Sequence, residues 1–471
     1  MTTRRAFLAG SSAAIVAGIA PRMAWGRTET DVAIIGAGLA GLSAARICEA
    51  AGLSVTVIEG SDRIGGRLYT LDDMPGAPEA GGIQVGAGYV RLHAMARELG
   101  VDLSSNEGQG AGRRQTPGNL YWVGGERIAP EAWPKNSANL LSEKERGTEP
   151  AALLRRYASA LPKLQQPQDW LTASRDLDIS VRQSLSAAGA SAEALRLIEA
   201  NFNGNSLAEM SALHLARTFT IYRSQPGPIS TITGGSQRLP EAMARSLSSA
   251  IRLKEPVQAI REEADGVSLR LSDQTMRARQ VICTIPFSAL RDVPVQGNFI
   301  DELRQMTLSL PYTRASFAYL TAKEPFWQDD PYPDTLWTDD PLIGRVFVLS
   351  DGSGGGPPML KLWTNGTGAD LFDRMPQETL ETEIIKRIER ARPSARGKLK
   401  VARLFSWQKV SGARGIYHHI GTGMAGYLAT ACKHQSSNLH FAGEHLAIAN
   451  SGMEGAIESG ERAAMRVLER T

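Results

Sequence analysis

The sequence is poor in the residues on which small disulfide-bonded folds and metal centres depend. It has only three cysteines, Cys48, Cys283 and Cys432, and they are too few and too scattered for a disulfide framework or a C-x-x-C metal site. The neighbouring His418 and His419 have diverging side chains on an extended chain, and no acid or cysteine stands at ligand spacing. We therefore expect no metal site. A G-x-S-x-G nucleophile turn is also missing.

The chain also has little net charge, because basic and acidic residues nearly balance. The formal net charge is +3 over 471 residues, and the lysines and arginines form no block interleaved with aromatic residues, which make up only 6% of the chain. Nucleic acid is therefore not an expected partner. The hydrophobic content of 42% is that of an ordinary globular protein, and the length suits two or three domains.

Long hydrophobic runs are missing too. The apolar run at residues 9–20 is shorter than the roughly 20 residues that cross a bilayer, and no membrane-length run follows it. Arg4 and Arg5 precede this run, so the beginning of the chain resembles a twin-arginine export signal. We predict a signal peptide at residues 1–26 and a periplasmic or exported mature protein without a stable membrane anchor. A plain membrane anchor is the alternative.

What the chain does have is a glycine-rich turn between two apolar runs. Residues 32–35 predict a buried strand, and residues 55–58 predict a second one. The glycines of the turn are Gly36, Gly38 and Gly41. The first permits a tight turn, the second lets the backbone approach a pyrophosphate, and the third lets the helix pack on the strand. The helix that follows offers the N–H groups of its first turn, at Leu39 and Ala40, to phosphates.

An acid ends the second predicted strand. Glu59 is spaced to accept hydrogen bonds from a ribose, and its charge favours a free 2′-hydroxyl over a 2′-phosphate. Because strand, turn, helix, strand and acid occur in order, we predict a dinucleotide site. The spacing by itself leaves NAD and FAD open.

The stretch that follows, EGSDRIGGR at residues 59–67, resembles the extension found after the second strand in the flavin-containing amine oxidase family, which includes the monoamine and polyamine oxidases. That resemblance implies FAD. Gly66 permits another close approach of the backbone, and Arg67 can place its guanidinium beside the pyrophosphate.

Further matches cover nearly all of the mature chain. Glu444 in the segment FAGE resembles the family's acid that binds the ribityl chain, and Val257 matches the position that meets the adenine end through its backbone. A helix that begins at Met453 would direct its amino-terminal dipole at the flavin and stabilise negative charge on the reduced ring. The other cofactor-binding residues that the resemblance implies are Gly82, Ile83 and Gly443.

The resemblance implies an α/β fold, with a Rossmann-like FAD-binding domain of the glutathione-reductase and amine-oxidase type and a discontinuous α+β substrate-binding domain. We expect the FAD-binding domain at residues 30–95, 230–300 and 401–471. The substrate-binding domain is expected at residues 96–229 and 301–400, the first of which is rich in short helical patterns.

The family oxidises the carbon that bears a neutral amine, giving an imine. The resemblance therefore implies an oxidoreductase with a small amine substrate, in which O2 (giving H2O2) or a periplasmic electron acceptor reoxidises the flavin. An aromatic pocket keeps the amine neutral, because desolvation disfavours an ammonium. Tyr417 matches one wall of this cage. Ile416 stands where monoamine oxidases carry a cysteine bonded to the flavin, so we expect noncovalent FAD.

Two departures from the family pattern concern the same site. Gly452 stands where the second aromatic of the cage is expected, and Phe317 stands where many members carry a lysine that holds water near the flavin. We therefore take Tyr417, Phe317 and Gly452 as the positions that decide the chemistry. The second departure puts fast reaction with oxygen in doubt.

Other functions on the same fold stay open. An L-amino-acid oxidase needs a cation for the substrate carboxylate, but the segment near Gln84 has no arginine where that branch carries one, although Arg91 follows. A desaturase acting on a carbon–carbon bond and a non-enzymatic FAD-binding protein are the further alternatives. The sequence leaves the oligomeric state open, with a homodimer among the options.

Overall fold

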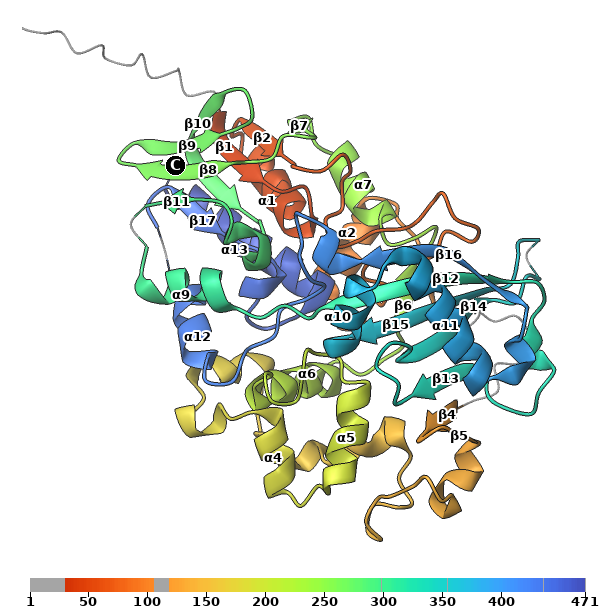
Figure 1. Cartoon of the computed structure of the whole chain (residues 1–471). Coiled ribbons are helices and arrows are strands. Elements are labelled where there is room, and N and C mark those ends of the chain that lie inside the picture. The colour runs from red at the N-terminus through yellow and green to blue at the C-terminus, as the bar shows by residue number, and fades with distance from the viewer. Residues whose placement is uncertain (1–29, 106–117, 298, 354, 435, 471) are drawn as a thin grey trace, which may run out of the picture.

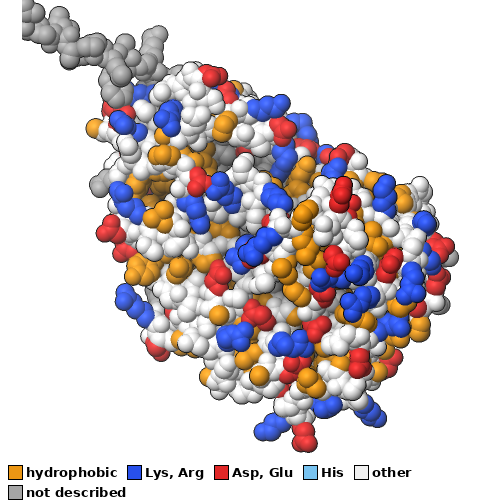
Figure 2. Space-filling model, viewed as in Figure 1, with side chains coloured by type: hydrophobic (Ala, Val, Ile, Leu, Met, Phe, Trp, Pro, Cys, Tyr) orange, Lys and Arg blue, Asp and Glu red, His pale blue; other side chains and the backbone are white. Residues whose placement is uncertain are grey.

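The computed structural model describes residues 30–105, 118–297, 299–353, 355–434 and 436–470. The expected signal peptide lies outside these residues. Figure 1 shows one β-sheet with its helices at the top left, a second sheet on the right, and a group of short helices below both. Figure 2 shows acidic and basic side chains interspersed over the visible face of the molecule.

The first sheet has eight strands, in the order β11-β8-β9-β10-β1-β2-β7, with β17 paired to β10. Its centre is parallel, because β1 pairs in parallel with both β2 and β10. Turns near Gly266 and Asp273 join β8, β9 and β10 into an antiparallel meander. The strands are β1 (Thr30–Ile35), β2 (Val55–Ile58), β7 (Ala250–Arg252), β8 (Ala259–Glu263), β9 (Gly266–Arg270), β10 (Thr275–Cys283), β11 (Val295–Gln296) and β17 (Leu439–Phe441).

Two helices, α1 (Leu39–Ala50) and α13 (Gly452–Leu468), pack closely together on this sheet. Helix α1 makes the crossover between the parallel strands β1 and β2. This agrees with the predicted order of strand, glycine-rich turn, helix and strand. A Cβ atom placed on Gly460 would lie 2.2 Å from the carbonyl oxygen of Ala40. Only glycine therefore permits this close approach of the two helices.

The second sheet has seven strands, in the order β16-β12-β15-β14-β13-β4-β5. Helices α10 (Thr367–Arg374) and α11 (Gln377–Ala391) contribute to one core cluster with leucines of the central strands. The opposite face is rich in aromatic side chains and packs against residues 69–80 and Trp407. The strands are β4 (Asn119–Val123), β5 (Glu126–Ile128), β12 (Ala315–Ala322), β13 (Thr335–Thr338), β14 (Arg345–Ser350), β15 (Met359–Asn365) and β16 (Leu399–Ser406).

The lower group contains α4 (Val181–Ala187), α5 (Ala192–Ala200) and α6 (Ala212–Ser224). Each helix has a serine N-cap: Ser180, Ser191 and Ser211 accept hydrogen bonds from backbone N–H groups in the first turn. Such caps satisfy amide groups that a short helix would otherwise leave without partners.

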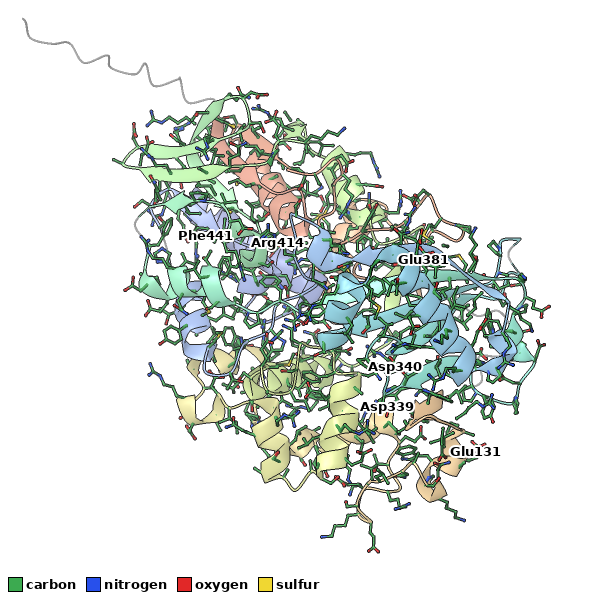
Figure 3. All side chains as sticks on the ribbon, in the orientation of Figure 1. Glu131, Asp339, Asp340, Glu381, Arg414 and Phe441 are labelled. Carbon is green, nitrogen blue, oxygen red and sulfur yellow. The ribbon has the colours of Figure 1, made fainter. Side chains whose placement is uncertain are left out.

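Ion pairs join this helical group to the second sheet. Asp339 and Asp340, labelled in Figure 3, directly follow β13. Arg196 of α5 pairs with Asp339 at 2.9 Å, and Arg387 of α11 pairs with Asp340 at 2.9 Å. Asp339 thus connects α5 to the end of β13, and Asp340 connects α11 to the same strand end.

Each sheet is assembled from separated stretches of the chain. Strands β1 and β2 are followed by β4 and β5 of the other sheet, and the chain returns to the first sheet at β7. Strand β16 belongs to the second sheet and runs across the expected boundary at residue 401. The exact division into two discontinuous domains stays a prediction. Within the described residues, no helix combines the length and apolar character needed to cross a membrane.

Candidate active site

The glycine-rich turn after β1 leaves the beginning of α1 open. Gly36 has φ of +107°, and a Cβ atom on Gly41 would lie only 2.0 Å from the carbonyl oxygen of Gly36. Helix α1 begins at Leu39 without a side-chain cap, so the amide groups of its first turn, including that of Ala40, have no side-chain acceptor. This arrangement suits an anionic phosphate at the amino terminus of the helix.

A second glycine turn lies against the first. The N–H group of Gly65 donates to the carbonyl oxygen of Ala37 at 3.0 Å, and a Cβ atom on Gly38 would lie 3.8 Å from Cα of Gly66. Glu59 accepts a 2.8 Å hydrogen bond from the N–H group of Ala37. The acid and both glycine turns therefore lie together at the carboxyl ends of β1 and β2.

The predicted adenine end lies beside this cradle. Val257 is buried, and its neighbour Pro256 lies 3.4 Å from the position that a Cβ atom on Gly60 would take. The cradle of glycines and the uncapped helix fit a dinucleotide such as FAD, since larger side chains would fill the space that the phosphates need.

At the other end of the site, a buried carboxylate lies between an arginine and a histidine. Oε2 of Glu444 lies 3.2 Å from Nη1 of Arg67, and Oε1 lies 2.8 Å from Nδ1 of His418. Burial opposes ionisation of Glu444, but His418 and Arg67 outweigh it and hold its pKa well below the ordinary value. Arg67 also donates a 2.7 Å hydrogen bond to the carbonyl oxygen of Ile416. Glu444 is thus an anion at neutral pH.

The amino terminus of α13 meets the segment that carries Gly82. A Cβ atom on Gly82 would lie 3.8 Å from Cγ of Met453, so two positions predicted to face the flavin are in contact. Ile83, the next residue, is partly buried. Gly443, with φ of +137°, turns the chain before Glu444. These residues come from both ends of the chain.

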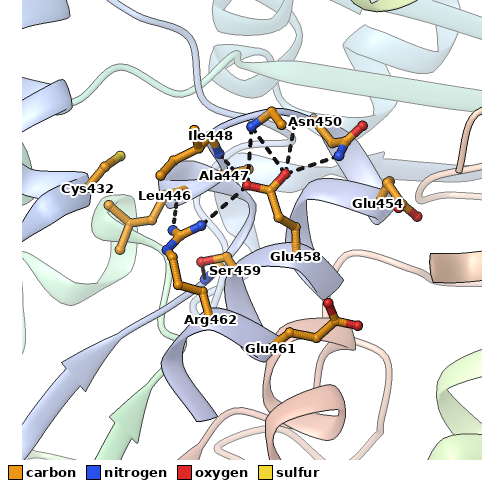
Figure 4. Close-up of polar contacts among 12 residues, drawn as sticks. Cys432, Leu446, Ala447, Ile448, Asn450, Glu454, Glu458, Ser459, Glu461 and Arg462 are labelled. Carbon is orange, nitrogen blue, oxygen red and sulfur yellow. Dashed lines mark hydrogen bonds and ion pairs between the residues drawn. The ribbon is translucent and has the colours of Figure 1, made fainter. Parts of the chain in front are cut away.

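The loop before α13 is held by one acid of the helix itself. Figure 4 shows Glu458, whose carboxylate accepts hydrogen bonds from the N–H groups of Ile448 at 2.8 Å and Asn450 at 2.9 Å. From the helical group, Arg217 donates to the carbonyl oxygens of Ala447 and Asn450. The position of the helix amino terminus is therefore fixed from both sides.

Tyr417 stands between two residues that contact Arg67 and Glu444. Ile416 accepts from Arg67 and His418 contacts Glu444, so the predicted cage wall is adjacent to the predicted ribityl site. The hydroxyl group of Tyr417 donates to the carbonyl oxygen of Asn203 at 3.3 Å. Burial raises the pKa of Tyr417, so its side chain is a neutral phenol.

The side chain of Tyr89, from another part of the chain, reaches Gly452. The hydroxyl oxygen of Tyr89 lies 3.3 Å from the position that a Cβ atom on Gly452 would take. Burial, together with Tyr222 and Glu454, raises the pKa of Tyr89 to about 12. Tyr89 was not among the residues predicted from the sequence, and its place in the segment of Gly82 is the one signal that points to it.

Tyr89 is fixed by the helix that follows it. It precedes α2 (Val90–Glu98), and the fully buried carboxylate of Glu454 accepts hydrogen bonds at 3.0 Å from the N–H groups of Arg91 and Leu92. A carboxylate at this place caps the helix and complements its dipole. Helix α13 therefore positions Tyr89 through Glu454.

Phe317 is buried in the aromatic face of the second sheet, next to a lysine from the neighbouring strand. Nζ of Lys361 lies 4.1 Å from the ring centroid of Phe317 and donates a 2.7 Å hydrogen bond to the carbonyl oxygen of Glu79. Burial outweighs the attraction of the Glu79 carboxylate and lowers the pKa of Lys361 to about 7. This lysine could not be predicted from the sequence, because only the strand register brings it beside Phe317.

Directly opposed residues form one row across this face. We call it the cross-strand row, and its members are Phe405, Phe317, Trp363, Arg345 and Trp337. Opposed residues of paired strands point to the same face of a sheet, so Arg345 interrupts an otherwise aromatic row. Phe317 and Trp363 pack edge to face with ring centroids 4.9 Å apart.

The histidines of the candidate site form a cluster rather than a metal centre. His214 lies edge to face with His418 at 5.7 Å, and Nε2 of His419 lies 3.3 Å from Oε1 of Glu209. Burial lowers the pKa of both His214 and His419. Among the described residues, no three histidine, cysteine, aspartate or glutamate side chains are grouped to hold a metal ion.

Comparisons with curated proteins find relatives that act on amino acids. Over 461 residues, the chain is 26% identical to an L-amino-acid oxidase of Mus musculus, covering 93% of this chain and 70% of that protein. Over 478 residues it is 24% identical to the flavin-dependent L-tryptophan oxidase RebO of Lentzea aerocolonigenes, covering 94% of this chain and 98% of the relative.

Solved structures of amine oxidases share the fold. Putrescine oxidase bound to putrescine superposes with a TM-score of 0.74 at 22% identity, covering 94% of this chain and 99% of that chain. Cyclohexylamine oxidase from Brevibacterium oxydans IH-35A gives a TM-score of 0.73 at 22% identity, covering 93% of this chain and 99% of that chain. The predicted α/β amine-oxidase fold is confirmed.

The flavin-containing amine oxidoreductase family model matches residues 39–468. This range begins at the first residue of α1 and ends at the last residue of α13, so it contains the helix beside the glycine turn, the Glu444 site and Tyr417. The chain belongs to the flavin-containing amine oxidoreductase family and is an oxidoreductase that acts on amines.

Proposed function

We propose that this protein binds FAD without a covalent bond and oxidises the C–N bond of a small amine to an imine. The observation that carries this proposal is the contact of Glu444 with Arg67 and His418, directly beside Tyr417 and the Gly82–Met453 contact. When bound, the flavin accepts the hydride equivalent that leaves the amine carbon. The residues of the chain bind and orient the two partners.

The site residues also set the charge state of the amine. Tyr417 and Tyr89 are neutral phenols, and Trp363 with Phe317 adds an apolar surface. Such surroundings desolvate an ammonium and favour the neutral amine, whose nitrogen lone pair assists the loss of hydride. In this proposal Tyr417 and Tyr89 form the two aromatic walls, with Tyr89 in place of the residue expected at Gly452.

The mode of flavin attachment is tested by acid precipitation of the purified protein. The aliphatic side chain of Ile416 has no group that could bond to the flavin, so we expect all of the FAD in the supernatant. Flavin that stays with the precipitated polypeptide would contradict this. Turnover with a panel of amines, under air and then with an artificial acceptor, tests the reaction, and no carbonyl product with either acceptor would overturn it.

The electron acceptor is proposed to be O2 or another periplasmic acceptor. Lys361 supports O2, because it places an amino group beside Phe317 at the position for which the family resemblance expects a lysine. If O2 is the electron acceptor, we expect the enzyme to form H2O2 in proportion to the substrate that it consumes under air. Turnover that needs an added acceptor would favour the other choice.

The cellular location is proposed from the residues before the described part of the chain. Arg4 and Arg5 ahead of the apolar run support export by the twin-arginine route. Changing both to lysine should leave the full-length protein inside the cell, as measured by fractionation and immunoblotting. Unchanged export of that double variant would reject the route.

A second candidate function is oxidation of an amino acid. The unpaired guanidinium of Arg345 in the cross-strand row favours it, and the relatives with amino-acid substrates agree with it. The sequence by itself makes this alternative the weaker one, because the segment near Gln84 lacks the arginine that the amino-acid oxidases carry there.

A further inference from the structure

Arg345 is a partly buried arginine without an acidic partner. Among the described residues, no carboxylate forms an ion pair with it, and its buried Nε has no hydrogen-bond acceptor. Its Nη2 donates to the neutral amide oxygen of Asn203 at 2.7 Å. Burial lowers the pKa of Arg345, which reflects a cation that lacks a compensating charge. The guanidinium can therefore bind a further acceptor.

Two other arginines of the interior pair with carboxylates, whereas the fully buried Arg217 donates to backbone carbonyl oxygens. Arg392, which is almost fully buried, pairs with Asp330 at 2.7 Å, and Arg67 pairs with Glu444. Buried guanidinium groups normally have such partners, because an unpaired buried charge is unfavourable. At Arg345 the aromatic faces of Trp363 and Phe347, with centroids 5.8 and 5.7 Å from Cζ, supply only weaker cation–π attraction.

The position of Arg345 connects it with the substrate wall. Asn203 accepts from Tyr417 through its carbonyl oxygen and from Arg345 through its side-chain oxygen. The charge of Arg345 also acts on the phenol of Tyr417, where it opposes the effect of burial on the pKa. A molecule that packs against Tyr417 and Trp363 therefore meets the guanidinium of Arg345.

The other cations around the site are already engaged. Arg91, which the sequence analysis considered, pairs with Glu454 at 3.2 Å and Glu461 at 2.7 Å. Arg314 pairs with Asp370 at 2.9 Å. Lys361 donates to a backbone carbonyl and carries only part of its charge at neutral pH.

On the basis of the proposed function, we infer that Arg345 binds the carboxylate of the substrate, and that the substrate is an amine that also carries a carboxylate. Arginine suits this task because its planar fork matches a carboxylate with two parallel hydrogen bonds. The amine end then lies toward Glu444 and the Gly82–Met453 contact, and the carboxylate lies toward β14. Gln84, an exposed neutral side chain, is not required as the anchor.

Carboxylate binding is measured first, without turnover. The holoenzyme is titrated with benzoate and with its neutral isostere benzamide, and the flavin absorbance reports the dissociation constants. Arg345→Met should weaken benzoate binding about 100-fold relative to benzamide, and Arg345→Lys should fall between, because lysine keeps the charge but loses the fork. The control is Arg127→Met, which removes an exposed arginine that lies over Tyr332 on the same sheet. Equal benzoate binding in the Met variant and the wild type would overturn the inference.

Substrate class is then measured by anaerobic flavin reduction with paired compounds. L-Phenylalanine is compared with phenethylamine, and γ-aminobutyrate with butylamine, so that the two pairs separate an α-carboxylate from a distant one. The wild type should prefer a carboxylate-bearing member, and Arg345→Met should reduce that preference about 100-fold. A wild-type preference for both plain amines overturns the inference but supports amine oxidation. If no compound reduces the flavin, the proposed function fails, and the benzoate titration alone decides the role of Arg345.

Discussion

Nη1 of Arg67 lies 3.2 Å from Oε2 of Glu444, although the two residues are 377 positions apart in the chain. The pair joins the glycine turn after β2 to the turn before α13, and His418 completes it on the other side of the carboxylate. The flavin end of the site is therefore built by contacts between the two ends of the chain.

Removing the charge of Glu444 should destabilise this junction. We expect Glu444→Gln to lower the free energy of unfolding by about 3 kcal/mol, because Arg67 and His418 lose a buried anion. Chemical denaturation at pH 7 measures the change. Glu461→Gln is the matched control, since Glu461 forms a more exposed pair with Arg91 and should cost at most about 1 kcal/mol. Equal losses in both variants would contradict the assigned importance of the Glu444 site.

The same carboxylate predicts a dependence on pH. Its pKa is lower in the folded than in the unfolded protein, so its stabilising contribution is present above the unfolded pKa of about 4.3 and is lost as the pH falls toward the folded value. The difference in stability between wild type and Glu444→Gln should therefore shrink when the pH is lowered from 6 to 3. A constant difference across this range would show that the charge is not responsible.

Tyr417 should affect the reaction more than cofactor binding. Tyr417→Ala removes the aromatic wall but leaves the backbone contact of Arg67 with Ile416, so we expect anaerobic flavin reduction to slow at least about 10-fold. Tyr417→Phe should keep most of the rate. Stopped-flow absorbance gives the rate and ultrafiltration gives FAD retention. Equal loss of both in Tyr417→Ala would place Tyr417 in the cofactor site instead.

Tyr89 should act as the second wall. Tyr89→Ala leaves the cap from Glu454 to α2 in place, because that cap uses backbone N–H groups. We expect a weaker apparent affinity for the substrate, by about 10-fold, in titrations of the flavin reduction rate. Tyr427→Ala, which alters an exposed tyrosine on α12 (Ala425–Lys433), is the control. If Tyr89→Ala and Tyr427→Ala have the same apparent affinity for the substrate, Tyr89 does not contact the substrate.

Lys361 should make stability rise with pH. Its folded pKa of about 7 lies below the ordinary 10.5, so between these values the unfolded chain binds more protons and the free energy of unfolding increases by up to about 1.4 kcal/mol per pH unit. Lys361→Met should lose this slope, as measured by urea denaturation at pH 7, 8 and 9. An unchanged slope in the variant would mean that other groups produce it.

The strands, turn and helix of the predicted nucleotide half could be predicted from the sequence because they are local. The strand, the glycines and the helix of residues 32–50 follow one another directly, and their spacing by itself indicates the turn. The helix predicted to begin at Met453 begins at Gly452. Local pattern and local structure agree in these elements.

The substrate half was harder to predict because it depends on strand register. Arg345 and Lys361 reach the neighbourhood of Phe317 only because β15 pairs with β12 and β14 pairs with β15. No periodicity in the sequence encodes that pairing. Tyr89 replaces the ring missing at Gly452 from a position more than 360 residues away. The strands β4 and β5 were also missed, although the Gly124–Gly125 turn between them is a typical hairpin signal.

The most direct test of the central claim is anaerobic titration of the purified yellow protein with amines, followed by admission of air. We predict that at least one amine bleaches the flavin absorbance stoichiometrically and that an imine or its carbonyl hydrolysis product appears. Recovery of the yellow colour in air would identify O2 as an acceptor, while slow recovery that an artificial acceptor accelerates would identify a different one. A flavin that no amine or amino acid reduces, although light and a donor reduce it readily, would contradict the account.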